Sequence, residues 1–418
     1  MNPLLANTDF ARDETAKGPA PVQSTGTQPP SAGTFSALEE LPSTLLGLFE
    51  QAERQSMFLG QPWFQHFVRT ALLPEDQVRI FAVTGEESPA SFSGMLLMRY
   101  TKGSELFPSP RKLSSLTNYY SCFFAPHLTT QNCRASQLLD KLAQEIARDR
   151  PRWDAIEINP LDVQAATFVE LVEAFKKAGY IVQTFFAFGN WYLPVNGRTF
   201  AEYFETLPSV LKNTWTRKKK KLEKSGRSKV EIVTGGPGLE TAIDAYTRVY
   251  LASWKHPEPH PDFIPGLIRM CAEAGTLRLG ILYVDEEPAA SQMWIVHNGK
   301  ALIYKLAYDE RFGELSVGTI LSARMFEHAL DVDKVKEVDY LSGDDAYKRN
   351  WMSHRRERWG ILALNPRTLR GALAIARHVG GRAAKRMMLS VLTSLRRTQP
   401  EELRRREGDV AATKRGAD

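Results

Sequence analysis

The 418-residue sequence predicts an α/β (α+β) fold in which two similar units follow one another. The chain is too long for a single hydrophobic core to be the expected arrangement. Both halves also show strand and helix patterns in the same order, which suggests an internal duplication. We therefore expect two tandem units, each a mixed, mostly antiparallel sheet flanked by helices. The expected divisions are a tail at 1–35, units at 36–196 and 197–364, and a second tail at 365–418.

The two tails differ in composition from the units and from each other. Residues 1–35 are rich in Pro, Gly, Ser, Thr and Gln and carry too little apolar surface to offset chain entropy, which predicts disorder. Residues 365–418 contain thirteen Lys or Arg against five acidic residues in a loosely amphipathic pattern. This predicts a basic helical tail. Two roles stay open for it: binding of an anionic membrane surface through 365–406, or packing against the second unit.

Charge and cysteine content narrow the class of protein. The formal net charge is +6, and the three cysteines have no spacing typical of a disulfide framework or zinc site. No apolar run is long enough to span a bilayer. His256 and His260 have a metal-binding spacing for a helix, but the prolines between them prevent that helix, so no metal is expected. We expect a cytoplasmic protein, or one at the inner face of the membrane.

The first unit should begin with two helices within Leu38–Leu72 and continue as an alternation of strands and helices. Apolar and aromatic runs predict strands at Val78–Val83, Phe92–Tyr100, Leu116–Phe124, Trp153–Ile158 and Tyr180–Val195. Helical spacing of apolar residues predicts helices at Ala135–Arg148 and Phe168–Ala178, the latter ending at Gly179.

The second unit should open with a basic helix and close around a glycine-containing loop. Helices are predicted at Ser209–Lys224, before Trp254, and at Phe263–Glu273. An antiparallel meander is predicted at Thr276–Val284, Ala289–Val296 and Ala301–Tyr308, followed by a helix at Thr319–Leu330 and a strand at Val335–Leu341. Helix N-termini attract phosphate, so the helix after Ser316, Val317 and Gly318 marks this unit as the active one.

Five consecutive cations, Arg217 to Lys221, lie on the basic helix. Residues advance by about 100° along a helix, so these side chains surround it and cannot all face one ligand. The pattern leaves two interpretations open. One is a solvated helix with one or two cations near an anion, and the other is a dedicated phosphate or nucleic-acid patch.

An ordered series of short motifs resembles the CelD/BcsL-type branch of the GNAT acyltransferase superfamily. The motifs are Leu116-Thr117-Asn118-Tyr119-Tyr120, Asn190-Trp191-Tyr192, Arg217 to Lys221, Tyr308-Asp309, Ser316-Val317-Gly318, Val338 to Asp344 and Tyr347-Lys348. They extend over most of the chain. The resemblance implies tandem GNAT units and transfer of an acyl group from acetyl-CoA or another acyl-CoA. Proteins of this branch are linked to bacterial polysaccharide or envelope biosynthesis.

The helix N-terminus and the resemblance together indicate which residues bind the donor. At the helix N-terminus, the backbone N–H groups of Val317, Gly318 and Thr319, helped by the hydroxyls of Ser316 and Thr319, would hold its phosphates. The strand before that helix is splayed from its neighbour in this superfamily, which would let the backbone at Leu306 to Tyr308 bind the thioester. Lys305 on the same strand would bind donor or acceptor. The spacing of Arg311, Gly313 and Gly318 departs from the usual phosphate loop, as does the acidic Glu314.

Catalysis would require an acid for the departing thiolate and a base for the nucleophile. The resemblance implies that Tyr347 is the acid, because many family members keep a tyrosine after the last core strand; simple packing is the alternative. Asp339 and Asp344 are the expected bases. A carboxylate in an apolar strand is costly without a partner, so an ion pair of Asp339 with Lys305, Lys348 or Arg349 is the alternative, and Asp344 could be a turn residue. Arg217, Lys221 and Lys348 are the expected substrate or anion contacts.

The sequence therefore predicts an acyl-CoA-dependent N- or O-acyltransferase that acts by direct transfer on a saccharide or envelope precursor, a substrate class implied by the resemblance alone. Two other functions stay open. Fem-type aminoacyl-tRNA-dependent ligases share tandem GNAT units and a basic helix, although the sequence lacks room for their long helical hairpin between 235 and 363, which disfavours nucleic acid as a partner. A non-catalytic scaffold of a polysaccharide-synthesis machine, anchored by the basic tail, is the other.

Overall fold

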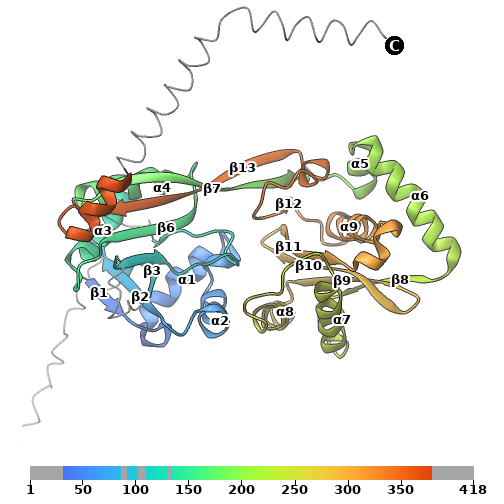
Figure 1. Cartoon of the computed structure of the whole chain (residues 1–418), viewed down its shortest axis with the longest axis horizontal. Helices are drawn as coiled ribbons and strands as arrows, with labels where there is room; N and C mark the ends of the chain where they lie inside the picture. Colours follow the sequence, from blue (N-terminus) through green and yellow to red (C-terminus); the bar gives the residue numbers. More distant parts are fainter. Residues whose placement is uncertain (1–31, 86–91, 102–109, 130–133, 379–418) are drawn as a thin grey trace, which may run out of the picture.

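A computed structural model describes residues 32–85, 92–101, 110–129 and 134–378. Its strands form one mixed sheet with the order β1-β2-β3-β4-β6-β13-β7-β12-β11-β10-β9-β8, and β5 pairs with β3 outside this path. Helices flank the sheet in both halves of the molecule (Figure 1). The expected α/β fold, with a mostly antiparallel sheet flanked by helices, is confirmed.

The first half of the sheet is built from β1 (Ala32–Phe35), β2 (Asp76–Thr84), β3 (Phe92–Thr101), β4 (Lys112–Ser115), β5 (His127–Leu128), β6 (Ala155–Asp162) and β7 (Ile181–Pro194). Its helices are α1 (Leu46–Glu53), α2 (Gln61–Ala71), α3 (Ala135–Arg148) and α4 (Ala166–Lys177), with short turns η1 (Leu38–Glu40), η2 (Ser43–Leu45) and η3 (Met57–Leu59). The apolar side of α3 is buried against the sheet, as its helical spacing predicts.

The second half contains β8 (Ser228–Val233), β9 (Leu277–Val284), β10 (Glu287–His297), β11 (Lys300–Tyr308), β12 (Glu337–Asp339) and β13 (His354–Leu364). Its helices are α5 (Phe200–Glu205), α6 (Ser209–Ser225), α7 (Leu239–Leu251), α8 (Phe263–Glu273) and α9 (Val317–Glu327). Short segments η4 (Glu310–Leu315), η5 (His328–Val332) and η6 (Lys348–Asn350) complete it; η5 is a π-helical turn that prolongs α9.

Both halves repeat one local arrangement. In the first half, β4 is antiparallel to β3, and the chain passes through α3 to β6, which lies parallel to β4. In the second half, β11 is antiparallel to β10, and the chain passes through α9 to β12, parallel to β11. The shared strand, helix and parallel strand agree with the internal duplication expected from the sequence.

Two long strands join the halves. β7 and β13 run antiparallel from the pair Tyr192 and His354 to the pair Ile181 and Leu364, and they span the molecule in Figure 1. β13 lies between β6 and β7, while the end of β7 pairs with β12. Residues 354–364, which the sequence assigned to the second unit, therefore complete the sheet of the first. A pattern of neighbouring residues cannot predict that a strand of one unit, here β13, pairs with strands of the other.

Three other expectations require correction. Residues 32–35, assigned to the disordered tail, form β1 because they pair with residues 80–83 of β2. The expected strand at 116–124 is a loop. The helix expected from Thr319 begins at Val317. The remaining residues of the expected N-terminal tail, and most of the basic C-terminal tail, lie outside the described residues; 369–378 are helical.

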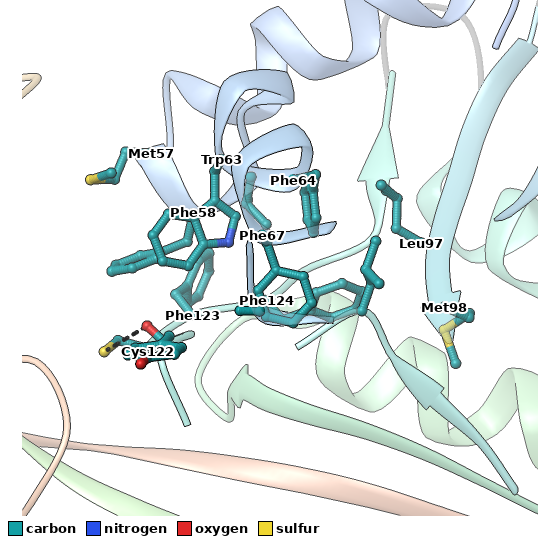
Figure 2. Packing of buried hydrophobic residues seen from close by; sticks show 14 of the residues in the cluster. Met57, Phe58, Trp63, Phe64, Phe67, Leu97, Met98, Cys122, Phe123 and Phe124 are labelled. Atoms are coloured by element: carbon teal, nitrogen blue, oxygen red, sulfur yellow. Dashed lines mark hydrogen bonds between the residues drawn. The ribbon is translucent and has the colours of Figure 1, made fainter. Parts of the chain in front are cut away.

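The loop at 116–124 is apolar because it is buried between elements. Phe123 and Phe124 lie beneath the aromatic side chains of α2, and Figure 2 shows Phe58, Trp63 and Phe67 gathered over them. The Phe124 N–H donates a hydrogen bond to the carbonyl of Pro160 at 2.8 Å. This buried backbone group therefore has a hydrogen-bond partner although the segment forms no strand pairing. An apolar run indicates burial and does not by itself separate a strand from a buried loop.

The core continues across both halves. Trp63 of α2 packs edge to face on Phe263 of α8 with 5.8 Å between ring centroids, and the His66 side chain bonds the Phe263 carbonyl. A second cluster centres on α9, where Phe326 stacks on Trp351. No helix among the described residues combines the length and apolar character that crossing a membrane requires.

Candidate active site

β11 and β12 separate part of the way along the sheet. They pair in parallel only at Lys300 with Glu337, Ala301 with Val338 and Leu302 with Asp339. Beyond this point β11 continues beside β10 alone, and the chain after β12 turns away. A cavity of about 220 Å³ fills the resulting opening, and we call it the inter-strand cavity. It is lined by Tyr119, Tyr120, Cys122, Lys255, Ile303, Tyr304, Lys305, Leu306, Tyr340, Leu341, Ser342, Asp345, Tyr347 and Lys348.

The turn that opens the cavity is held by side chains at its base. Leu341 has a φ of 57°, a conformation that is rare for a bulky residue and costs free energy. Its N–H donates to Asp339 Oδ1 at 2.6 Å, and its carbonyl accepts from Asn190 Nδ2 at 2.8 Å. Asn190 comes from the Asn-Trp-Tyr motif on β7. These hydrogen bonds direct the chain away from β11 and keep the strands apart.

Glu258 connects the two units by bonding three of the residues that line the cavity. Its carboxylate accepts from Lys305 Nζ at 2.6 Å and from the Tyr120 hydroxyl at 2.9 Å, and the Tyr119 hydroxyl also donates to it. Burial alone would raise the pKa of Glu258, but the hydrogen bonds from Lys305 and Tyr119 outweigh it and lower the pKa. The ammonium of Lys305 also lies over the rings of both tyrosines, at 5.4 and 5.2 Å.

The placement of Tyr347 suits a proton donor. Its side chain lines the inter-strand cavity and remains 43% exposed, so a ligand can reach it. Its ring packs at right angles on Tyr340, and its hydroxyl bonds no group within the described residues. Burial, with a contribution from the charge of Asp345, raises the pKa of Tyr347. The hydroxyl stays protonated at neutral pH, as in any tyrosine, and is a weaker acid than usual.

The two expected bases lie outside this cavity. Asp339 is buried, accepts from Asn190 and Leu341, and forms an ion pair with Arg356. The partner is on β13 and is none of the three cations considered from the sequence. Asp339 borders a separate cavity of about 120 Å³ between the units. Its position supports the structural alternative, in which the carboxylate holds the turn.

Asp344 is exposed and paired. Its carboxylate lies 2.8 Å from Arg355 Nη2 and accepts from Trp191 Nε1 at 2.7 Å. The hydrogen bonds from Arg355 and Trp191 lower the pKa of Asp344, which makes it a weak base.

The N-terminus of α9 follows the end of β11. Ser316 takes a left-handed conformation, and the helix begins at Val317. Three N–H groups, those of Val317, Gly318 and Thr319, precede the first intrahelical bond, which runs from Ile320 to the Ser316 carbonyl. The ring of Tyr308 lies beside this turn: a Cβ atom added to Gly318 would be 3.2 Å from Tyr308 Cδ1.

The expected anion contacts separate into two kinds. Arg217 and Lys221 are exposed on α6 and line neither the inter-strand cavity nor the cavity beside Asp339. Lys218, between them in sequence, reaches the carbonyl of Glu314 just before α9. Lys348 is buried and donates to the Ser342 carbonyl at 2.5 Å, and it pairs with Asp345 at 3.2 Å. Its contacts are those of a residue that holds the 342–345 turn.

Two segments supply residues of the site that the sequence did not predict. The proline-rich loop after α7 supplies Lys255, which lines the cavity, and Glu258, which bonds lining residues. The loop after β4 supplies Tyr119 and Tyr120. Lys255 and Glu258 lie in or beside a proline-rich segment without helix or strand periodicity, so the sequence pattern could not predict where their side chains lie. The pair of adjacent tyrosines belonged to the recognised motif but was read as part of a strand. Within the described residues, no cluster of three or more His, Cys, Asp or Glu side chains could hold a metal ion.

Residues 209–349 match the family described as acetyltransferase (GNAT) domain. No curated protein sequence matches the chain. Similar solved structures include FemX, with TM-score 0.50, 12% identity and coverage of 75% of this chain and 92% of that one. A tandem GNAT protein from the clavulanic acid biosynthesis pathway gives 0.47 and 12%, with coverage of 81% and 100%. The C-terminal domain of a putative lysylphosphatidylglycerol synthetase from Agrobacterium fabrum gives 0.46 and 13%, with coverage of 80% and 96%.

Proposed function

We propose that this chain, which carries a GNAT acetyltransferase domain at 209–349, transfers an acyl group from a thioester donor bound in the inter-strand cavity. The divergence of β11 from β12 after the pair Leu302 and Asp339 is the observation that supports this most strongly. It frees one edge of β11 at 303–306, where backbone groups have no partner strand and face a cavity. Unpaired strand edges readily accept an extended ligand such as a pantetheine arm.

The donor's phosphates would lie at the start of α9. Its three free N–H groups and the positive end of the helix dipole favour an anion, and α9 follows β11 directly through η4. This fits acetyl-CoA or another acyl-CoA, whose diphosphate and thioester are joined by an extended chain. Glu314 is exposed beside the helix, and the nearby Lys218 offsets its charge.

The chemistry would be direct transfer in a ternary complex. The nucleophile of the acceptor attacks the thioester carbonyl and loses its proton to water, the carbon–sulfur bond breaks, and the thiolate leaves and takes a proton from a donor that solvent then reprotonates. Tyr347 is the proposed donor of a proton to that thiolate, because it lines the cavity and its hydroxyl bonds no group among the described residues. Lys305 would position the reactants from β11. The Asp339 carboxylate would act by holding the turn at Leu341.

The acceptor is proposed from resemblance. The motifs similar to the CelD/BcsL-type branch suggest a saccharide or envelope precursor, acylated on nitrogen or oxygen. Binding of the basic tail to an anionic membrane would bring the enzyme to such a precursor. Most of that tail, 379–418, lies outside the described residues.

A Fem-type ligase that uses aminoacyl-tRNA is the second candidate. The fold is shared with FemX over most of both chains. Arg217 and Lys221 are exposed on α6 and form no ion pair within the described residues, so they could contact a phosphate backbone.

Isothermal titration of the purified chain with acetyl-CoA, longer acyl-CoAs and charged tRNA separates the two. Saturable binding of acyl-CoA supports the first function. Binding of charged tRNA alone, weakened by Arg217→Ala with Lys221→Ala and by salt, supports the second. Binding of neither donor by the folded protein would contradict both and favour the scaffold function.

A further inference from the structure

One of the three lysines in the inter-strand cavity has no acidic partner. Lys305 pairs with Glu258 at 2.6 Å, and Lys348 pairs with Asp345 at 3.2 Å. No carboxylate among the described residues forms an ion pair with Lys255, which lines the same cavity. Three ammonium groups therefore face two carboxylates, and the cavity carries one excess positive charge at Lys255.

The surroundings of Lys255 make that charge costly. The residue is partly buried, and its ammonium lies 5.7 Å from the ring of Trp254 and 5.8 Å from the ring of Tyr250. Burial is the main cause that lowers the pKa of Lys255 to about 8; the charges of Lys305 and Lys348 act in the same direction, and those of Glu258 and Asp345 oppose them. Contacts with aromatic faces compensate only part of the lost hydration. An anion in the cavity would supply the missing counter-charge.

We propose that Lys255 binds an anionic group of a substrate, a carboxylate or a phosphate, inside the inter-strand cavity. This rests on the proposed function only in attributing the anion to a donor or an acceptor. The ammonium groups of Lys305 and Lys348 line the same cavity and would add to the attraction. The acceptor would then be an acidic molecule, or the group carried by the donor would bear a negative charge.

Binding of an anion at Lys255 should be coupled to uptake of a proton, and this coupling can be measured without knowing the substrate. An anion binds the protonated lysine, so it raises the pKa of Lys255 and draws a proton from solution near pH 8. Affinity should be greatest below that pH and should fall as the pH rises through it. A neutral ligand would show neither effect.

Competitive labelling with a trace of acetic anhydride, read by mass spectrometry across pH, reports each lysine of the intact chain separately. Without ligand, we expect Lys255 to be labelled at pH 8 about a hundredfold faster than an ordinary exposed lysine, because far more of it is neutral. Saturating inorganic phosphate or succinate should slow its labelling about fivefold or more if the pKa rises by one unit. Exposed Lys336 serves as the internal control and should be unaffected.

The two probes distinguish the sources of the anion. A response to phosphate alone indicates a phosphorylated ligand, and a response to succinate alone indicates a carboxylate. If labelling of Lys255 responds to neither while the chain is folded, the inference is wrong. In Lys255→Gln, and separately in Lys255→Met, calorimetric binding of the effective probe and its proton uptake should both disappear. Retained binding in folded variants would equally overturn the assignment.

Acetyl-CoA titrated into the same samples separates this inference from the proposed function. A response of Lys255 to phosphate or succinate in a chain that binds no acyl-CoA would keep the anion site and remove the donor assignment. Binding of acyl-CoA in a chain whose Lys255 labelling does not respond to either anion would keep the donor assignment and remove the anion site.

Discussion

Glu258 Oε1 lies 2.6 Å from Lys305 Nζ, which ties the proline-rich loop after α7 to the strand that borders the inter-strand cavity. The other oxygen of the same carboxylate accepts hydrogen bonds from the hydroxyls of Tyr119 and Tyr120 of the first unit. The site is thus assembled from both units. This gives the first unit a part in building the inter-strand cavity, even though the features proposed to bind phosphate belong to the second.

Tyr347→Phe should lower turnover by about a hundredfold or more while leaving stability unchanged, because general acid catalysis contributes about that much. The lost hydroxyl bonds no group within the described residues, and the ring can still pack on Tyr340. Steady-state rates with acyl-CoA and an identified acceptor measure this. Tyr192→Phe, on β7 outside the cavity, is the matched control. Wild-type turnover in Tyr347→Phe would assign the residue to packing alone.

Asp339→Asn should destabilise the fold by about 2–3 kcal/mol, since it breaks a buried ion pair with Arg356. The decrease in the free energy of unfolding should be smaller than for a buried charge left without any partner, because Arg356 still pairs with Glu337 at 2.8 Å. Urea unfolding followed by circular dichroism gives the free energy. Asp344→Asn, at an exposed pair, should change it little. An Asp339→Asn protein of wild-type stability but without activity would restore Asp339 as the catalytic base.

Gly318→Glu should weaken acyl-CoA binding at least tenfold, because it places bulk and negative charge at the N-terminus of α9. The new side chain meets Tyr308, which must shift by a few tenths of an ångström, so the protein should remain folded. Gly238→Glu is the control, since it adds the same charge before α7, where a Cβ meets nothing within 4 Å. Normal donor affinity in folded Gly318→Glu would exclude this phosphate site.

Stability should fall as the pH drops from 7 to 5. Burial lowers the pKa of His127 to about 4, and the hydrogen bond to the Leu59 carbonyl opposes this only in part. The unfolded chain binds a proton near pH 6.5 that the folded chain excludes, so folding loses about 2 kcal/mol by pH 5. Urea unfolding at both pH values measures the loss. His127→Gln should reduce the difference; an unchanged difference would show that other groups cause it.

The sequence predicted local features better than long-range ones. Helical spacing located α3, and β-branched and aromatic runs located β9 to β11, because each depends on a few neighbouring residues. The glycine loop before α9 was identified for the same reason. The insertion of β13 between β6 and β7 depends on contacts between residues far apart in the chain, and no local pattern encodes it.

The sequence predicted those residues of the candidate site that lie close together along the chain. Lys305, Leu306 and Tyr347 do line the inter-strand cavity, since strand divergence and the following turn are continuous in sequence. The partner of Asp339 is Arg356 on β13, which only the strand exchange brings close. Lys255 and Glu258 come from an irregular loop, where residue type gives no direction for the side chain.

Amide hydrogen exchange with and without acetyl-CoA tests the central claim most directly, that a thioester donor lies along β11 where β12 has diverged. We predict slower exchange within 303–308 and at 317–319 when acetyl-CoA is bound, because alternate N–H groups of this part of β11 face the edge that β12 has left, and the others lie at the helix N-terminus. The amides of β9, already paired on both sides with β8 and β10, should not change. Bound acetyl-CoA that leaves 303–308 unprotected would contradict the claim.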